Sequence, residues 1–255
     1  TFCNCKLSMS LEIKVEIISQ LSDNYAYIVF STTEKKALVV DPAESRPIID
    51  FIEKNNLTLE ALLITHNHHD HTSGIEDLLH FKKVSVYSPN SQINGTTNLI
   101  QNNKILNFKF IEFEIIATPG HTIDHIVYYS KKNNNLFAGD TIFSLGCGRV
   151  FEGTYEQMFN SLQIINNLPD QTNVYCGHEY TLQNYKFLDS IFINSKALDS
   201  YKVKIDERLK NQKCTIPFLL SDEKKNNPFL CSERNSYSQY MKKNKLSGFS
   251  FFTHI

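Results

Sequence analysis

The run Thr65–His71, which reads Thr-His-Asn-His-His-Asp-His, constrains this chain more than any other feature, because it directly follows a short apolar strand, Ala61–Thr65. Imidazole and carboxylate side chains are the usual protein ligands of zinc and of neighbouring divalent metals. His66 and His68, which are separated by one residue, can direct their two imidazoles at one ion. Asp70 and His71 lie where the chain turns into a helix, and they can bind a second ion close by. The alternative, polar residues scattered on a loop, does not account for so dense a run.

Three later segments repeat the arrangement of an apolar strand, a small residue and a ligand-type side chain. They are Thr118–His121, Ala138–Asp140 and Cys176–His178, each with a glycine directly before its histidine or aspartate. A single Gly-His or Gly-Asp pair is more often a simple turn. Because α/β folds gather their sites at strand ends from distant parts of the chain, the three segments together with the histidine run predict one shared metal site.

Short strand-like runs alternate with helical runs up to about residue 180. The expected strands are Leu11–Ile18, Tyr25–Phe30, Ala37–Val40, Ala61–Thr65, Val84–Tyr87, Phe108–Ala117, Ile126–Tyr129, Leu136–Ala138 and Asn173–Cys176. The expected helices are Arg46–Asn55, a helix capped by Thr72 or Ser73 that runs to Phe81, and Tyr155–Leu168. From Thr181 onward the strand pattern stops and charged, helix-like segments follow. We therefore predict a mixed α/β domain over residues 9–180 and a mostly helical domain over 181–255, with residues 1–8 as a tail or the remnant of a leader.

The composition excludes several classes of protein. The chain has 255 residues, of which 41% are hydrophobic and 21% charged, as in ordinary globular proteins. No apolar run approaches the roughly 18 residues that cross a bilayer, and no secretory signal is visible. Six cysteines in a chain of this size do not suggest a disulfide framework. We expect free thiols and a cytoplasmic location, or an organellar one if residues 1–8 remain from a leader.

The net charge of −1 conceals an asymmetry between the two predicted domains. Residues 1–180 carry 13 lysines and arginines against 20 aspartates and glutamates, whereas residues 181–255 carry 13 against 7. A basic C-terminal segment suggests an anionic ligand or partner, although a solvated helical surface has the same composition. A non-enzymatic nucleic-acid-binding protein is a further alternative. It is disfavoured because the tail lacks regular aromatic–basic interleaving.

Together these elements resemble the metallo-β-lactamase superfamily and, within it, the hydroxyacylglutathione hydrolase (glyoxalase II) family. The resemblance rests on the order of the ligand-type residues and on five further segments, and it extends from about Met9 to about Lys245. The segments are Leu21–Tyr25, Gly139–Phe143, Gly146–Arg149, Tyr175–Thr181 and Asn227–Phe229.

The resemblance implies a fold and a set of metal ligands. The fold is an α/β metallo-β-lactamase αββα sandwich with a mostly helical C-terminal domain. By motif, one divalent ion is held by His66, His68 and His121, a second by Asp70, His71 and His178, and Asp140 bridges both. Zinc is the expected metal, with iron and manganese as possible substitutes. His69 is not expected to be a ligand, and His125 is expected to support the site from behind.

The resemblance also implies an activity. It is hydrolysis of the thioester S-D-lactoylglutathione, a small molecule, to D-lactate and glutathione by a metal-bridging hydroxide that Asp70 orients as the catalytic residue. Arg149, Tyr180, Lys242 and Lys245 are the expected substrate-binding residues. Arg149 stands where relatives commonly have lysine, and Phe151 where many have tyrosine. We expect no nucleic-acid partner, no membrane association, and a monomer or weak dimer.

Two other enzymes remain open on the same domain. One is a different hydrolase of the superfamily, such as a lactonase. The other is a mononuclear iron persulfide dioxygenase, which resembles this chain around Gly146–Arg149. That enzyme needs neither His178 in its Tyr175–Thr181 context nor so long a helical tail.

Overall fold

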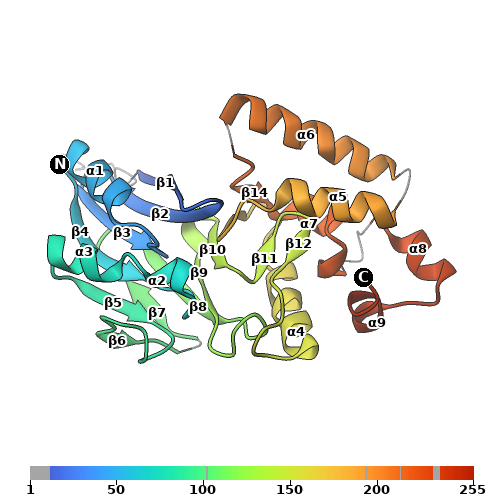
Figure 1. The fold of residues 1–255 in the computed structure, drawn as a ribbon, viewed down its shortest axis with the longest axis horizontal. Coiled ribbons are helices and arrows are strands. Elements are labelled where there is room, and N and C mark those ends of the chain that lie inside the picture. The colour runs from blue at the N-terminus through green and yellow to red at the C-terminus, as the bar shows by residue number, and fades with distance from the viewer. Residues whose placement is uncertain (1–11, 102, 193–194, 213, 232–235) are drawn as a thin grey trace, which may run out of the picture.

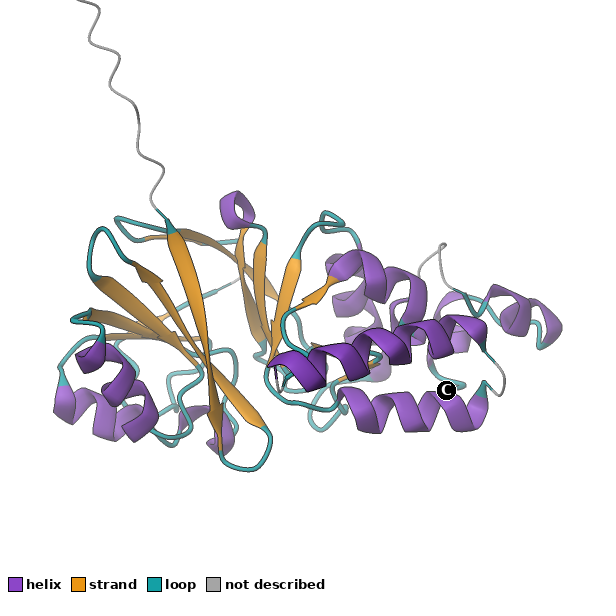
Figure 2. Cartoon of the chain, turned by 90° about the horizontal axis from the view of Figure 1, so that it is seen from above, coloured by secondary structure: helices purple, strands orange, loops and turns teal. Residues whose placement is uncertain are grey.

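The computed structural model describes residues 12–101, 103–192, 195–212, 214–231 and 236–255, so the predicted tail over residues 1–8 lies outside the described residues. Two six-stranded sheets lie face to face, as Figure 2 shows. The first sheet has the order β1-β2-β3-β4-β5-β6, antiparallel from β1 to β3 and parallel from β3 to β6. Its strands are β1 (Ile13–Gln20), β2 (Asn24–Ser31), β3 (Lys36–Val40), β4 (Thr58–Leu63), β5 (Ser85–Ser88) and β6 (Asn98–Leu99).

The second sheet has the order β14-β13-β10-β9-β8-β7, and only β10 and β13 run parallel in it. Its strands are β7 (Ile105–Asn107), β8 (Glu112–Ala117), β9 (Ile126–Ser130), β10 (Asn135–Gly139), β13 (Asn173–Cys176) and β14 (Phe218–Leu219). A separate two-stranded hairpin, β11 (Ile142–Phe143) with β12 (Gly146–Cys147), follows β10. A short 3-10 helix, Lys131–Asn133, connects β9 to β10.

Alternation along the strands divides the apolar side chains between two layers. In β2, which is buried along its whole length, Tyr27 and Val29 face the core between the sheets, whereas Ile28 faces the opposite side. This follows from the period of two residues in a strand. The helices α1 (Arg46–Lys54) and α3 (Ile75–Phe81) cover that opposite side, and Figure 1 shows them at the outer edge of the molecule.

The outer face of the second sheet is covered by α4 (Tyr155–Asn166), which buries Met158, Leu162 and Ile165. These side chains recur at helical spacing and so form one apolar stripe. Thr154 begins the helix with a capping box, in which it and Gln157 exchange side-chain and backbone hydrogen bonds. The layers therefore run helix, sheet, sheet, helix, and the predicted αββα sandwich is confirmed.

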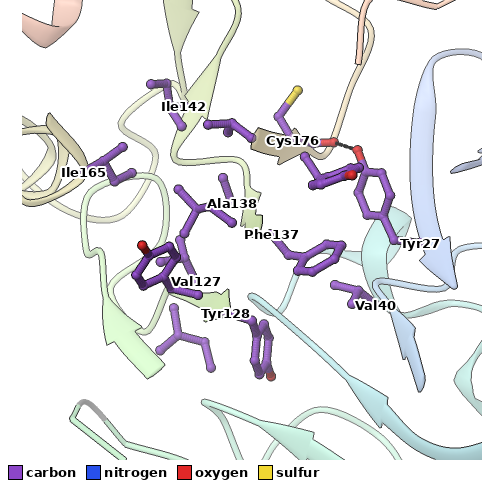
Figure 3. Close-up of a cluster of buried hydrophobic side chains, with 14 of the residues drawn as sticks. Tyr27, Val40, Val127, Tyr128, Phe137, Ala138, Ile142, Ile165 and Cys176 are labelled. Carbon is purple, nitrogen blue, oxygen red and sulfur yellow. Dashed lines mark hydrogen bonds between the residues drawn. The ribbon is translucent and has the colours of Figure 1, made fainter. Parts of the chain in front are cut away.

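The core between the sheets fixes the strand ends that border the functional site (Figure 3). Phe137 is fully buried and stacks on Tyr175, with ring centroids 5.0 Å apart. Tyr27 packs against both rings and donates its hydroxyl hydrogen to the carbonyl oxygen of Cys176. Strands β2, β10 and β13 are thereby held together just before the residues at their ends.

The C-terminal part of the chain is mainly helical and has its own apolar core, around Leu188, Leu198, Tyr201 and Phe251. It lies beyond the second sheet, at the orange and red end of the ribbon in Figure 1. Its helices are α5 (Thr181–Ile191), α6 (Lys196–Gln212), α7 (Leu220–Asn226), a short 3-10 helix (Pro228–Leu230), α8 (Ser238–Lys243) and α9 (Gly248–Phe252). Within the described ranges, no helix is both long and apolar enough to span a membrane.

Three local predictions were wrong. The expected strand Phe108–Ala117 begins only at Glu112, because Phe108 and Ile111 close a turn in which the backbone nitrogen of Phe108 donates to the Ile111 carbonyl oxygen at 2.9 Å. Neither Thr72 nor Ser73 caps a helix: α2 (His69–Thr72) begins earlier, and Gly74 precedes α3. A strand, β14, also occurs after residue 180, where none was expected. The division at 180/181 into two domains stays a prediction.

Candidate metal centre

The seven ligand-type residues predicted from the sequence meet at one edge of the sandwich. His66 follows β4, Asp140 follows β10, and His178 follows β13. Asp70 and His71 lie on the single turn of α2, and His121 lies in the loop after β8. The strands end at this edge because their apolar runs end there, and the next residues are free to turn inward.

Three groups of potential ligand atoms form there; two are distinct, and the third, Asp41 with His66 and His71, takes its histidines from those two. The first group is His66, His68 and His121, and the second is Asp70, His71 and His178. Within each group the ligand atoms all lie within 4.8 Å of one another. The structure therefore brings together the two half-sites that the family motif implies.

Asp140 lies between the two groups. Its Oδ2 atom is 3.4 Å from His121 Nε2 in the first group and 3.3 Å from His178 Nε2 in the second. Its Oδ1 atom is 3.4 Å from His71 Nε2. Tetrahedral zinc with bonds of about 2.0–2.1 Å places neighbouring ligand atoms about 3.3 Å apart, so this spacing fits a carboxylate shared by two ions.

The hydrogen bonds behind the histidines direct their lone pairs inward. His71 Nδ1 lies 3.2 Å from the Asp41 carboxylate, and His178 Nδ1 lies 2.9 Å from the Asp23 carboxylate. His121 Nδ1 lies 2.8 Å from the carbonyl oxygen of Arg149. Because these oxygens can only accept, each Nδ1 carries the hydrogen and each Nε2 keeps a lone pair for a metal.

Two hydrogen bonds in series, through the Thr65 hydroxyl, hold His66 in the same tautomer. Thr65 donates its hydroxyl hydrogen to Asp41 Oδ2 at 2.7 Å, so the Thr65 oxygen accepts from His66 Nδ1 at 2.9 Å. His68 differs, since its Nδ1 atom faces the site, 3.0 Å from His121 Nε2. Two imidazole nitrogens this close are expected where both bind one cation.

Several buried side-chain atoms of the described residues have no hydrogen-bond partner, and three of them belong to the predicted ligands. They are His66 Nε2, His71 Nε2 and Asp140 Oδ1. A buried polar atom without a partner costs about 1–3 kcal/mol, and His71 Nε2 and Asp140 Oδ1 lie 3.4 Å apart. The residues present thus fit a pair of divalent cations.

The charges at the site agree with this fit. Burial strongly lowers the pKa of His66, and the neighbouring histidines lower it further, so this imidazole is neutral at pH 7. Burial also lowers the pKa of His71, but the carboxylates of Asp140, Asp41 and Asp70 outweigh burial and raise it to about 9. Such a concentration of negative charge around a buried imidazole is what a bound cation would neutralise.

His125 lies behind the site rather than in it, as expected. It is fully buried, and its Nε2 atom accepts a hydrogen bond from the backbone nitrogen of Asp140 at 3.1 Å. Its Nδ1 atom contacts the hydroxyl groups of Thr118 and Thr141 at 3.0 and 3.1 Å. His125 therefore holds the backbone of Asp140 and leaves the Asp140 carboxylate free.

Sequence reasoning missed Asp23 and Asp41 as supports of the site. In the sequence, Asp41 and Pro42 only end the strand Ala37–Val40, and Asp23 belongs to a turn-forming cluster before Tyr25. Asn24, noted only within a family motif, donates from Nδ2 to Asp70 Oδ2 at 2.9 Å. The one available signal was that both aspartates directly adjoin buried strands.

A cavity of about 520 Å³ opens onto the two ligand groups. Arg149 and Tyr180, two of the four expected substrate-binding residues, line it. Tyr180 stacks on the ring of His178, with centroids 4.6 Å apart. The full lining is His68, Asp70, His121, Asp140, Phe143, Cys147, Arg149, Phe151, His178, Tyr180, Gln183 and Asn184.

Lys242 and Lys245 are exposed, on α8 and just after it, and neither lines this cavity. The structure does not bring them to Arg149 and Tyr180, so their role stays a prediction. His69, His80 and His254 are also exposed and belong to neither ligand group. The four described cysteines, Cys147, Cys176, Cys214 and Cys231, are free thiols.

Replacing Asp41 by asparagine is expected to weaken metal binding about 10- to 100-fold, as loss of a support behind a metal ligand commonly does. The amide nitrogen would face either the Thr65 backbone N–H, at the position of Oδ1, or both the His71 Nδ1–H and the Thr65 hydroxyl, at the position of Oδ2, and only an acceptor fits at either position. Asp41 has a φ of 51°, which asparagine tolerates, so the backbone should not change. Competition with a chromophoric chelator measures the affinity. An affinity equal to that of the unchanged chain would contradict the assigned role.

Comparisons with known proteins cover nearly the whole described chain. The family model described as "Metallo-beta-lactamase superfamily" matches residues 21–109 and 104–178, and the one described as "Hydroxyacylglutathione hydrolase C-terminus" matches residues 179–255. A hydroxyacylglutathione hydrolase of Citrobacter koseri is 46% identical over 82% of this chain and 83% of its own length. One of Salmonella paratyphi A is 41% identical over the same shares of the two chains.

Solved structures share the fold. The BLEG-1 B3 metallo-beta-lactamase superimposes with a TM-score of 0.58 at 25% identity, over 66% of this chain and 91% of that one. ETHE1 from Myxococcus xanthus superimposes with a TM-score of 0.65 over 95% of both chains. At 22% identity, this second likeness shows the fold alone.

Proposed function

The chain belongs to the hydroxyacylglutathione hydrolase family of the metallo-β-lactamase superfamily, and we propose that it hydrolyses 2-hydroxyacylglutathione thioesters, S-D-lactoylglutathione among them, to a 2-hydroxy acid and glutathione. One observation carries the proposal beyond the family name. A single cavity is lined both by the metal-ligand groups and by Tyr180, Gln183 and Asn184, which lie in the region matched by the C-terminal family model. The reacting bond and the glutathione moiety can therefore occupy one continuous space.

The proposed ligands are those of the family motif, with His66, His68 and His121 on one ion, Asp70, His71 and His178 on the other, and Asp140 shared. When bound, two divalent ions supply hydroxide near neutral pH and polarise the thioester carbonyl. Zinc at both positions, a monomer or weak dimer and a cytoplasmic location are parts of the same proposal.

Asp70 is the proposed catalytic residue. Burial raises its pKa, but His71, the hydrogen bond from Asn24 and His178 outweigh burial and hold the pKa below its usual range. The carboxylate is therefore ionised at neutral pH and can accept a hydrogen bond from the attacking water. It lines the cavity, so it can orient that water toward the carbonyl carbon.

The leaving thiolate needs no acid from the protein. A thiol has a pKa of about 8.5, so its thiolate departs readily near neutral pH. A covalent route through Cys147, which lines the cavity, is disfavoured, because burial raises the pKa of its thiol to about 12. Burial likewise raises the pKa of Tyr180 to about 12, so its hydroxyl stays a neutral donor toward substrate.

Replacing Arg149 by alanine is expected to raise KM roughly tenfold or more with little change in kcat. Its guanidinium group borders the cavity and would contact the anionic peptide of glutathione, a contact that is equal in the ground state and the transition state. Lys243→Ala is the matched control, because Lys243 is exposed and lines no part of the cavity. A fall in kcat at unchanged KM would contradict the role of Arg149. The same assay on Lys242→Ala and Lys245→Ala tests their predicted contacts.

The alternatives are separated by their products. Incubation with S-D-lactoylglutathione should release free thiol and D-lactate in equal amounts, without oxygen uptake. A persulfide dioxygenase would instead consume oxygen with glutathione persulfide, and a lactonase would open lactones without releasing thiol. Faster turnover in either of these two assays than in the thioester assay would overturn the proposal.

A further inference from the structure

The hairpin β11–β12 forms one wall of the cavity, and it is too small to hold its own shape. Only two residue pairs join its strands, Ile142 with Cys147 and Phe143 with Gly146. It begins two residues after Asp140 and ends two residues before Arg149, and it contributes Phe143 and Cys147 to the cavity lining. Isolated two-stranded hairpins are at best marginally stable in water, so the position of this wall depends on what surrounds it.

Two buried side chains of the C-terminal region hold the backbone at the hairpin tip, Phe143–Gly146. Glu223 on α7 accepts from the backbone nitrogen of Leu145 at 2.7 Å and from the Ser144 hydroxyl at 3.0 Å. Asn227, directly after α7, donates from Nδ2 to the carbonyl oxygens of Phe143 at 3.1 Å and Gly146 at 2.9 Å. Both side chains are fully buried.

The tip also inserts into the C-terminal core. Leu145 is fully buried there, beside Leu188 and Leu198, although it belongs to the sandwich part of the chain. Its φ of 60° lies in the left-handed region, which is costly for a leucine and needs support from its surroundings. Asn184 adds a third side-chain contact, donating to the Ser144 carbonyl oxygen at 2.9 Å, and it lines the cavity itself.

A carboxylate at position 223 is not explained by packing. Its side chain has no ion-pair partner among the described residues, and burial raises its pKa to about 7, because an ionised carboxylate is costly to bury without such a partner. A leucine would fill a similar volume without that cost. Hydrogen bonding accounts for the residue, because three donors converge on it from Leu145, Ser144 and Tyr201.

We propose that Glu223 and Asn227 are positioning residues, which set the wall formed by Phe143, Cys147 and Arg149 at the correct distance from the metal ligands. They do not touch substrate and act through the hairpin. The inference rests on the proposed function, since it takes this cavity to receive the glutathione part of the thioester. It assigns to the C-terminal region a second task besides contacting substrate, namely shaping a wall that the sandwich itself contributes.

The test compares Glu223→Ala and Asn227→Ala with Glu223→Gln and Asn226→Ala, each with its metals bound. Glutamine can accept from the Leu145 nitrogen and donate to the Ser144 and Tyr201 hydroxyls, so it should preserve the hairpin. Asn226 is the neighbouring control, because its side chain donates only to the Asp222 carbonyl oxygen within α7. Two substrates are used, S-D-lactoylglutathione and S-lactoyl-N-acetylcysteamine, which lacks the peptide that the wall would contact.

Both alanine variants should raise KM for the glutathione thioester about tenfold or more. Their kcat and their rate with the short thioester should change less than about threefold, because the chemistry at the metals is untouched. Glu223→Gln and Asn226→Ala should keep the original KM. If Glu223→Ala does not fold, the KM of Asn227→Ala for the glutathione thioester tests the proposal by itself.

Three results would overturn the assignment. They are an unchanged KM in Asn227→Ala, equal losses with both thioesters, and a Glu223→Gln variant as impaired as Glu223→Ala. Failure of the proposed function has a different signature, because the unchanged chain would then hydrolyse neither thioester.

Discussion

Asp140→Asn is expected to lower kcat by about a thousandfold or more. Asp140 lies within 3.3–3.4 Å of ligand atoms from both groups, and an amide cannot supply two anionic oxygens to two cations. Loss of the metal pair removes the hydroxide supply, since metals lower the pKa of water from 15.7 to about 7. The variant should also bind fewer than two metals per chain.

Metal analysis and steady-state kinetics on the same preparation check both parts of this prediction. His69→Ala is the matched control, because His69 lies next to Asp70 but is exposed and belongs to neither ligand group. It should keep its metals and its kcat. An Asp140→Asn variant with full metal content and near-normal turnover would show that Asp140 is not shared between two ions.

Gly177→Ala is the second change with a large expected effect. A Cβ atom at this position would overlap Asp140 Oδ1 and would lie 2.6 Å from His71 Cε1. Neither group can retreat easily, because Asp41 holds His71 and the carboxylate of Asp140 is enclosed by three histidines. We expect a loss of metal affinity of at least about 100-fold and a stability loss of about 1–3 kcal/mol from overpacking.

Thermal unfolding with and without chelator separates the two effects of Gly177→Ala. The unchanged chain should lose stability when chelator removes its metals, whereas the variant should respond little, having few metals to lose. Gly248→Ala is the control for a loss of stability without crowding of the metal ligands, because Gly248 has a φ of 48° and its added Cβ would meet only Phe159, at 3.9 Å. That control should keep its response to chelator. If chelator lowers the thermal stability of Gly177→Ala as much as that of the unchanged chain, the added Cβ does not crowd the metal ligands.

The seven ligand positions could be predicted because their signal is local. Each is a ligand-type residue in or just after a loop that an apolar strand enters, and His121, Asp140 and His178 directly follow a glycine. The αββα layering was implied by the family resemblance, but the alternation of strands and helices beneath it has a local signal, such as the helical period of α4. These features need no knowledge of distant parts of the chain.

The supports of the site could not be predicted, because they depend on distant pairs. Asp41 meets His71 thirty residues later, and Asp23 meets His178 across 155 residues. Within its own segment, each aspartate has the ordinary appearance of a turn residue.

The cavity wall formed by the hairpin β11–β12 could not be predicted from the sequence for a different reason. Strands of two residues, such as β11, β12 and β14, are too short to show a period. Glu223 lies in a charged segment that resembles a solvated helix, yet it is fully buried. The expected strand Phe108–Ala117 failed because Phe110 and Ile111 are apolar and buried, as strand residues would be, although they lie in the turn before β8.

We propose that this chain hydrolyses a glutathione thioester with metals held by the two ligand groups. The most direct measurement follows the loss of thioester absorbance and the release of free thiol from S-D-lactoylglutathione. It is made before chelation, after chelation, and after zinc, iron or manganese is restored. We expect turnover to disappear with chelator and to return with at least one metal, with one thiol released per thioester. Turnover that chelator does not affect, or a metal-loaded chain that leaves the thioester intact, would contradict the account.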